Sequence, residues 1–172
     1  TKPGVTNIVD ELLERGLLSQ GAEESRQNRG RPGVLLCINA QATSIIVTEL
    51  RAFHTAVVAF DLLGQELYRE RATTSYNLTP EERVTEVQPM LERSIQSASR
   101  QAARIAKVIF AVPGIIDVDM KITSSSLNWE KLELLDYIKS VVPSSVPIEL
   151  NTVAKLAALA EYRYIVRSNK TS

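Results

Sequence analysis

Five apolar residues recur at helical spacing near the start of the chain, at Val5, Ile8, Val9, Leu12 and Leu13. Intervals of three and four residues place such side chains on one face of a helix, which we expect over residues 4–15. Gly16 comes next, and glycine commonly ends a helix because it tolerates the left-handed backbone conformation. An isolated helix cannot bury its own apolar face, so this pattern predicts contact with helices outside this chain or with another subunit.

The pattern changes after a polar, glycine-containing stretch at residues 19–33, which indicates an exposed loop or hairpin tip. Short apolar runs rich in Val, Ile, Phe and Leu follow, and these residues favour strands. We expect strands at residues 34–39, 44–50, 54–60, 66–72, 107–112 and 146–150. Residues 61–64 have the composition of a hairpin turn between two of these strands.

A long amphipathic helix is predicted to begin just after Thr79. Thr79 is a good N-cap, Pro80 suits the first helical position, and Glu82 completes a capping box. The helical pattern continues to about residue 106. Pro89 should kink this helix or divide it in two, because proline lacks the backbone N–H of the helical ladder.

Two further helices are predicted, at residues 130–140 and 152–166, and Asn151 is expected to cap the second. Helices thus alternate with the later strands, whereas the earlier strands follow one another directly. This order predicts an α/β domain with a mixed sheet, antiparallel at the start and parallel later.

The composition narrows the setting in which the protein works. Lys and Arg total 20, Asp and Glu total 20, and the formal net charge is zero, so DNA binding would need a local basic patch. The single cysteine, Cys37, lies in an apolar run and is expected to be a small buried hydrophobe without a disulfide. No apolar run reaches the roughly 18–20 residues of a membrane span, and no signal peptide opens the chain. We therefore expect a cytoplasmic protein.

The chain begins at Thr1 rather than methionine and ends just after a predicted helix. Both ends are interpreted as cuts in a longer protein.

Several segments, taken in order, resemble the repressor/open-reading-frame/kinase (ROK) family. Residues 1–18 are similar to the recognition helix of that family's winged helix-turn-helix, and the Arg-Gly-Arg-Pro of residues 29–32 is similar to the end of its wing. The remaining similarities are to the family's actin-like domain and lie at residues 60–64, 111–117, 127–129 and 147–151. The resemblance implies part of a winged helix-turn-helix over residues 1–33. It implies the first half of an actin-like, ribonuclease H-like sugar-kinase domain over residues 34–172.

Two departures from the kinases of the family argue against catalysis. Where those kinases carry an Asp-x-Gly phosphate loop, this chain has Glu49, Leu50 and Arg51, and an arginine blocks the close backbone approach that glycine permits. Where they carry a general-base aspartate after the asparagine, Thr152 follows Asn151, and a hydroxyl does not accept a proton near neutral pH. We therefore predict no catalytic residue.

The resemblance also nominates binding residues. Lys2, Thr6 and Asn7 lie at the end of the first helix that would read bases or phosphates. Arg26, Arg29 and Arg31 would contact backbone or minor groove from the wing. The alternatives are an ordinary amphipathic helix and a solvated loop.

A sugar ligand would lie beside Gly114 and Asn151, although the first is equally explained as a turn residue and the second as a helix cap. His54 is expected to be structural or solvent-facing. Asp117 and Asp119 are expected in a solvated turn rather than a metal site. Trp129 is expected to be a packing anchor.

These features favour a sugar-responsive bacterial transcription regulator of the repressor type. We expect it to bind a DNA operator as a homodimer and to take a sugar or sugar phosphate as effector. The alternatives are a sugar kinase of the same family and an interaction module that binds neither DNA nor sugar. No cofactor is expected in this chain, because the family's zinc motif would lie beyond Ser172.

Overall fold

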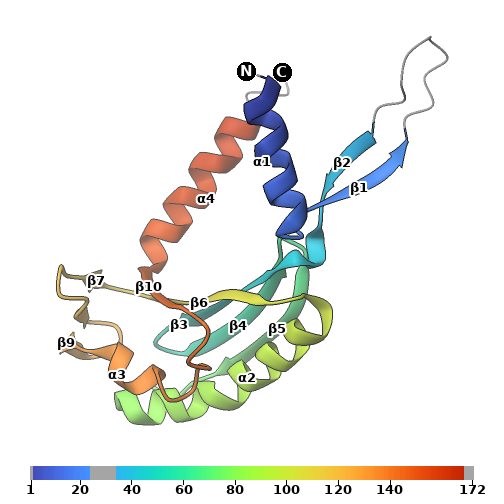
Figure 1. The fold of residues 1–172 in the computed structure, drawn as a ribbon. Helices are drawn as coiled ribbons and strands as arrows, with labels where there is room; N and C mark the ends of the chain where they lie inside the picture. Colours follow the sequence, from blue (N-terminus) through green and yellow to red (C-terminus); the bar gives the residue numbers. More distant parts are fainter. Residues whose placement is uncertain (1, 24–33, 169–172) are drawn as a thin grey trace.

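The computed structural model describes residues 2–23 and 34–168, which form an α/β structure (Figure 1). Its helices and strands are α1 (Lys2–Glu14), β1 (Leu18–Glu23), β2 (Val34–Ile38), the 3-10 turn η1 (Ala40–Ala42), β3 (Ser44–Leu50), β4 (His54–Asp61), β5 (Glu66–Thr73), α2 (Pro80–Gln101), β6 (Ile105–Val112), β7 (Ile115–Ile116), β8 (Ile122–Ser124), β9 (Trp129–Leu132), α3 (Leu134–Ile138), β10 (Ile148–Thr152) and α4 (Val153–Ser168).

The central sheet has five strands in the order β10-β6-β3-β4-β5. The hairpin-linked strands β3, β4 and β5 pair antiparallel, whereas β6 joins β3, and β10 joins β6, in parallel. The parallel pairs arise because the chain crosses back before each new strand, through α2 before β6 and through the segment that contains α3 before β10. The predicted mixed sheet, antiparallel first and parallel later, is confirmed.

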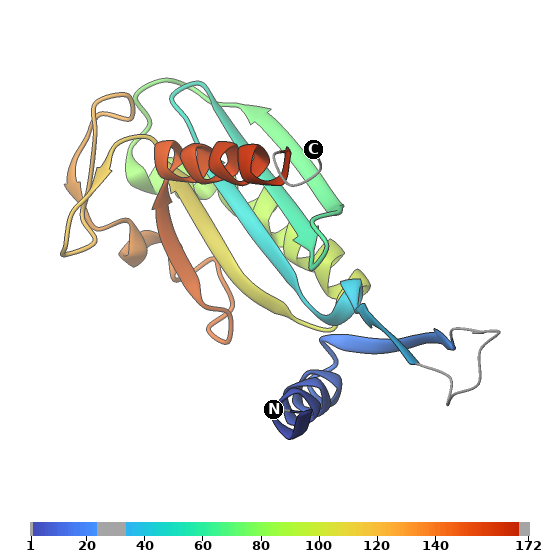
Figure 2. The same cartoon turned by 90° about the horizontal axis from the view of Figure 1, so that it is seen from above.

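The two faces of this sheet are covered unequally. Helix α2 lies along one face, and α4 stands over the other (Figures 1 and 2). Alternate residues of β3 point to opposite faces, so Ile46 and Leu50 are buried with α2, while Ile45 and Val47 are only half-buried. The core of the described part is therefore the layer between the sheet and α2.

Helix α2 begins as predicted. The Thr79 side chain accepts a hydrogen bond from the backbone N–H of Glu82 at 3.2 Å, and the Glu82 carboxylate accepts one from the N–H of Thr79 at 2.8 Å. The helix runs through Pro89 without a break, so the expected division in two is wrong. It also ends at Gln101, earlier than predicted, because the backbone of Ala102 is extended.

Gly16 stops helix α1 at the C′ position, as predicted. Gly16 has a φ of 67°, and the N–H groups of Gly16 and Leu17 donate to the carbonyls of Leu13 and Leu12. This pattern is a Schellman motif. Val5 is 63% exposed and Ile8 59% exposed, so much of the apolar face of α1 has no cover within the described residues.

The structure corrects the expectation for residues 34–39. Strand β2 does not join the central sheet; it pairs antiparallel with β1 in a separate two-stranded sheet. All five β2 side chains are exposed, and Cys37 is among them, so its predicted burial is also wrong. The physical reason is that no second layer packs on this ribbon among the described residues. Short apolar runs do not reveal which strand they will pair with.

The predicted helix over residues 130–140 is also wrong in part. Trp129–Leu132 forms β9, which pairs with β8, and only Leu134–Ile138 is helical. Asn128 and Lys131 have positive φ angles of 54° and 48°, which a helix does not permit. Trp129 is 6% exposed and belongs to the core, as expected of a packing anchor.

Candidate functional site

Three parallel strands end side by side at one edge of the central sheet. Ala111 of β6 lies between Glu49 of β3 and Asn151 of β10 in the strand register. The chain leaves β3 toward β4 on one side and returns to β6 on the other. Such a reversal of strand order, at the carboxyl ends of parallel strands, is where open α/β sheets usually bind ligands. This edge is the candidate site.

The β3–β4 hairpin at this edge holds an ion pair between Glu49 and Arg51. These are the residues that the resemblance places where the kinases carry their phosphate loop. Nε of Arg51 donates a hydrogen bond to Oε1 of Glu49 at 2.7 Å. Nη2 of Arg51 also lies 2.7 Å from the same oxygen. His54 opens β4, half-buried, with Nε2 4.0 Å from Oε2 of Glu49. A hairpin filled by these side chains does not offer bare backbone amides to a phosphate in the manner of a glycine loop.

Gly114 follows β6 and has a φ of 133°. A Cβ atom at this position would lie 2.3 Å from the backbone oxygen of Thr123, on the neighbouring strand β8. The close approach of these backbones accounts for the glycine by itself. The structure thus supports the turn interpretation of Gly114, and sugar contact stays a prediction.

The cap of α4 is Thr152 rather than Asn151, which corrects the sequence expectation. The Thr152 hydroxyl accepts a hydrogen bond from the N–H of Lys155 at 3.2 Å. Asn151 lies within β10, where its side chain accepts from the N–H of Thr152 at 3.0 Å and donates to Glu149 at 3.3 Å. The correction arises because α4 begins at Val153, one residue later than predicted. Thr152, which the resemblance predicted to stand in place of the kinase aspartate, therefore has a structural role as the cap of α4.

An ion pair close to Asn151 joins the neighbouring strands β6 and β10. Nζ of Lys107 donates to Oε2 of Glu149 at 2.7 Å, and both side chains are 40% exposed. The hydrogen bond from Lys107 lowers the pKa of the Glu149 carboxyl, against a smaller opposing effect of partial burial. The charge of Lys107 and the amide of Asn151 act in the same direction as the hydrogen bond.

This lowered pKa predicts a pH-dependent contribution to stability. Because the folded-state pKa lies below the ordinary value of about 4.3, the ionised form of Glu149 stabilises the fold above that value. The contribution is lost as the pH falls through the lowered pKa. We expect Glu149→Gln to lower the free energy of unfolding at pH 7 by less than about 1 kcal/mol, since the pair is solvent-screened.

The loss should shrink when urea unfolding is repeated below pH 4. In a Lys107→Met background the same substitution should have little effect at either pH. A loss that does not change with pH would contradict the assignment.

A cleft of about 320 Å³ lies beside the candidate site, between α4 and the sheet. We name it the α4 cleft. Its floor is apolar, and charged side chains join it from the β3–β4 hairpin region and from β5. Its lining includes Val47, Glu49, Arg51, Val58, Phe60, Arg69, Leu156 and Ala157. Arg69, Leu156 and Ala157 were not predicted from the sequence. The alternation of side chains along β5 was the available signal for Arg69. Arg69 pairs with Val58, and Val58 pairs with Val47, so the three side chains lie on the same face of the sheet.

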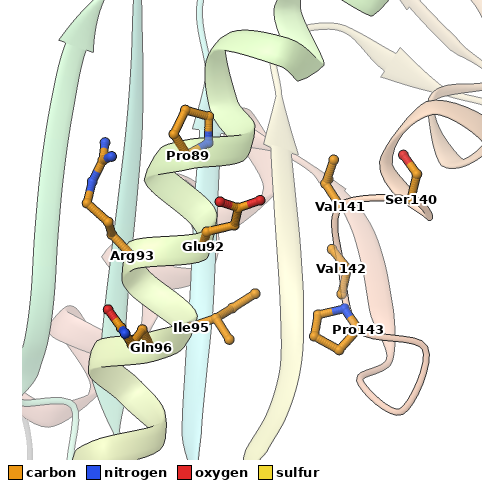
Figure 3. A pocket seen from close by; sticks show the side chains of 9 residues that line it. All are labelled: Pro89, Glu92, Arg93, Ile95, Gln96, Ser140, Val141, Val142 and Pro143. Carbon is orange, nitrogen blue, oxygen red and sulfur yellow. The ribbon is translucent and has the colours of Figure 1, made fainter.

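A larger cleft, of about 590 Å³, lies on the other face of the sheet between α2 and the segment after α3 (Figure 3). Its walls include Ile95 and Val142, and its charged side chains are Glu92 and Arg93. Both are already engaged: Glu92 accepts from Gln88 at 2.8 Å, and Arg93 binds Glu70 at 2.6 Å. The edge at the carboxyl ends of the parallel strands, where open α/β sheets usually bind ligands, therefore stays the stronger candidate.

The acidic turn after β7 behaves as expected. Asp117 Oδ1 accepts hydrogen bonds from the N–H groups of Asp119 and Lys121, both at 2.9 Å, and both aspartates are exposed. No group of three or more potential metal ligands occurs in residues 2–23 and 34–168. Within those same ranges, no helix combines the length and apolar character needed to cross a membrane.

The predicted DNA-binding residues are only partly described. Thr6 and Asn7 are exposed on α1, as are Asp10 and Glu14. The side chain of Lys2 lies outside the described part of the structure. Arg26, Arg29 and Arg31 fall in residues 24–33, which are also outside it.

Comparison with known proteins gives a consistent set of similarities. A family model described as ROK family matches residues 49–172. A xylose repressor from Caldicellulosiruptor bescii is 24% identical over 163 residues, which cover 93% of this chain and 40% of that protein.

Two solved structures resemble the fold. One is a ROK family transcriptional regulator, a homologue of the E. coli MLC protein, with a TM-score of 0.69 and 19% identity over 94% of this chain and 40% of that one. The other is a ROK family glucokinase from Streptomyces griseus in complex with glucose and AMPPNP, with a TM-score of 0.53 and 19% identity over 70% of this chain and 36% of that one. At these identities the likeness establishes the shared fold. The chain spans about two fifths of the repressor and of the regulator.

Proposed function

Because the chain belongs to the ROK family, we propose that it is part of a bacterial transcription regulator that senses a sugar or sugar phosphate and does not phosphorylate it. The repressor and regulator relatives align over more than nine tenths of the chain, whereas the glucokinase aligns over 70%. This difference supports the regulator over the kinase.

The observation that carries the proposal is the chemistry of the candidate site. Arg51 and Glu49 fill the hairpin at which a kinase of this fold holds phosphate, and Thr152 replaces the proton-accepting carboxylate. The Thr152 hydroxyl is engaged as the cap of α4. Phosphoryl transfer depends on positioned anion donors and an oriented nucleophile, and the described residues at this edge supply neither.

We place DNA recognition in α1 and the β1–β2 hairpin. A helix followed by a two-stranded antiparallel ribbon is the order of a recognition helix and wing. Within that proposal Lys2, Thr6 and Asn7 contact DNA from the helix, and the wing contributes Arg26, Arg29 and Arg31. The ribbon continues to Ile38, so the DNA-binding part would extend past the boundary at residue 33.

The exposed apolar face of α1 fits an arrangement in which further helices of the intact regulator pack on it. The proposal includes a homodimer on a palindromic operator, with half-sites about one helical turn or a multiple apart.

The test uses the full-length protein and its upstream DNA. We expect specific binding whose affinity falls steeply with salt, because phosphate contacts release counterions. Asn7→Ala should weaken specific binding by about 1–3 kcal/mol, measured by fluorescence anisotropy. Asp10→Ala, on the same exposed helix, is the matched control and should not weaken it. Equal binding by Asn7→Ala and the wild type would remove α1 as the reading helix.

The kinase alternative is tested on the same preparation. With ATP and a panel of monosaccharides, we expect no sugar-dependent release of ADP. Sustained sugar-dependent turnover would establish the kinase instead. Residues 1–172 alone should bind DNA poorly, because the apolar face of α1 is largely uncovered among the described residues.

A further inference from the structure

The β4–β5 and β7–β8 hairpins turn with the same set of hydrogen bonds. Each turn begins with an aspartate, Asp61 or Asp117, whose N–H donates to the residue four positions later and whose carbonyl accepts from the residue three positions later. The aspartate Oδ1 also accepts from the residues two and four positions later. The fourth residue is Gly64 in one turn and Met120 in the other, with left-handed φ angles of 84° and 63°. Glycine is preferred at this position of a hairpin loop, so the methionine is the exception.

Met120 belongs to an exposed apolar surface at the end of its hairpin. Val118, in the same turn, is 98% exposed, and Ile115 at the start of β7 is exposed as well. We name Ile115, Val118 and Met120 the apolar tip. An exposed apolar side chain kept in an unfavourable backbone conformation points to a contact that the side chain makes.

The apolar tip has an acidic border. Asp117 and Asp119 flank Val118, and neither forms a salt bridge with another residue of 2–23 or 34–168. Lys121, which follows them, is paired with Glu133 at 2.8 Å. This negative charge disfavours DNA as the partner of the tip. It also disfavours a contact between the tips of two copies, because like charges would meet.

The same edge of the central sheet carries an exposed aromatic pair. Phe53 is 64% exposed and Tyr76 53% exposed, and their rings stack with centroids 5.4 Å apart. The N–H of Thr74 donates to the carbonyl of Phe53 at 3.0 Å, which ties the two segments together. Phe53 follows β3 and the apolar tip follows β6, and these strands are parallel neighbours. Both features therefore project from the carboxyl edge of the sheet.

Arg71 adds a positive charge close to this aromatic pair. It is exposed on β5, three residues before Thr74, and among the described parts of the chain it has no salt bridge. We name Phe53, Tyr76 and Arg71 the aromatic surface. Methionine sulfur packs favourably on aromatic rings, and arginine binds carboxylates. The aromatic surface is thus complementary to the apolar tip and its aspartates.

We propose that a second copy of this chain covers the apolar tip, with the tip of each copy packed on the aromatic surface of the other. This inference rests on the homodimer of the proposed function and identifies a contact within it. Because both surfaces project from one edge of the sheet, a two-fold axis beside that edge forms the two contacts at once and closes the assembly as a dimer.

The experiment is disulfide cross-linking between two preparations of the full-length protein, both with Cys37→Ser to remove the exposed thiol of β2. One preparation is isotope-labelled and carries Met120→Cys; the other is unlabelled and carries Tyr76→Cys. After mixing and mild oxidation, we expect a disulfide between a labelled peptide with position 120 and an unlabelled peptide with position 76, identified by mass spectrometry. Leu63→Cys in place of Met120→Cys is the matched control. Leu63 is exposed on the other hairpin, at the opposite end of β4 from Phe53, and should give no such link.

Met120→Gly separates the contact from the turn. Glycine relaxes the left-handed position, so we expect the urea midpoint of unfolding to rise. The association of two copies should weaken about tenfold, the usual effect of losing an anchor side chain, as measured by sedimentation velocity. Val118→Ser should weaken association to a similar degree, whereas Leu63→Ser should leave it unchanged. A purely structural role of Met120 would move stability and association in the same direction.

The outcomes separate this contact from the proposed function. The absence of the link between positions 120 and 76 overturns the contact, and so does unchanged association of Met120→Gly copies. If Met120→Cys resists thiol labelling in dilute, monomeric protein, another part of the same chain covers the tip, and the second copy is overturned. In each of these cases salt-dependent DNA binding, measured separately, leaves the regulator standing. If the link forms and the protein does not bind DNA, the proposed function fails while this contact holds.

Discussion

Replacing Gly114 with alanine is expected to lower the free energy of unfolding by about 3 kcal/mol, which combines the cost of an unfavourable φ with that of a backbone clash. The new Cβ would lie 2.3 Å from the oxygen of Thr123 and 3.1 Å from Ser124. Both neighbours are in β8, so the small sheet of β7, β8 and β9 would have to shift. Chemical denaturation with urea measures the effect.

Gly64→Ala is the matched control. Gly64 also has a positive φ, 84°, but a Cβ there would meet nothing within 4 Å. Only the dihedral cost remains, about 1–2 kcal/mol, and it is partly offset by the reduced entropy of the unfolded chain. Equal losses for the two variants would show that β8 does not approach Gly114 as closely as the structure places it.

The second large effect compares neighbouring isoleucines on β3. Ile46 is 0% exposed and faces α2, whereas Ile45 is half-buried on the face of α4. We expect Ile46→Ala to lower the free energy of unfolding by about 3–4 kcal/mol, because the substitution leaves a cavity in a packed layer. Ile45→Ala should cost about 1 kcal/mol, since a partly exposed side chain loses less buried area.

The pair tests which face of the sheet carries the stability of this part of the protein. The two residues have the same side chain and lie in the same strand, so propensity cancels in the comparison. Equal losses measured on residues 1–172 would contradict the unequal covering of the two faces. A larger loss at Ile45 in the full-length protein would instead show that another part of the protein covers the α4 face.

The successes of the sequence analysis are local. The capping box at Thr79, the left-handed Gly16 and the strands from Ser44 to Thr73 depend on residues a few positions apart. The hydrogen bonds that define a cap close within one helical turn, so their donors and acceptors are visible in the sequence.

The failures concern partners that are distant in the chain or positions that depend on such partners. Residues 34–38 have the apolar composition of a core strand, yet they pair with β1 and stay exposed. The segment from Trp129 to Leu132 became a strand because β8 lies beside it. Asn151 does not cap α4, because β10 continues to Thr152, two residues further along β6 than predicted.

The residues of the candidate site also fall into two groups, those located from the sequence and those located only from the tertiary structure. The sequence by itself located Glu49, Arg51 and Thr152, since each is judged by the chemistry of its own side chain at one place in the chain. Only the tertiary structure joined Arg69 of β5 and Ala157 of α4 to them in one cleft. The physical reason is that side-chain chemistry belongs to a residue, whereas a cavity depends on strand register and on where a helix packs. Those are decided by contacts between segments that are distant in the chain.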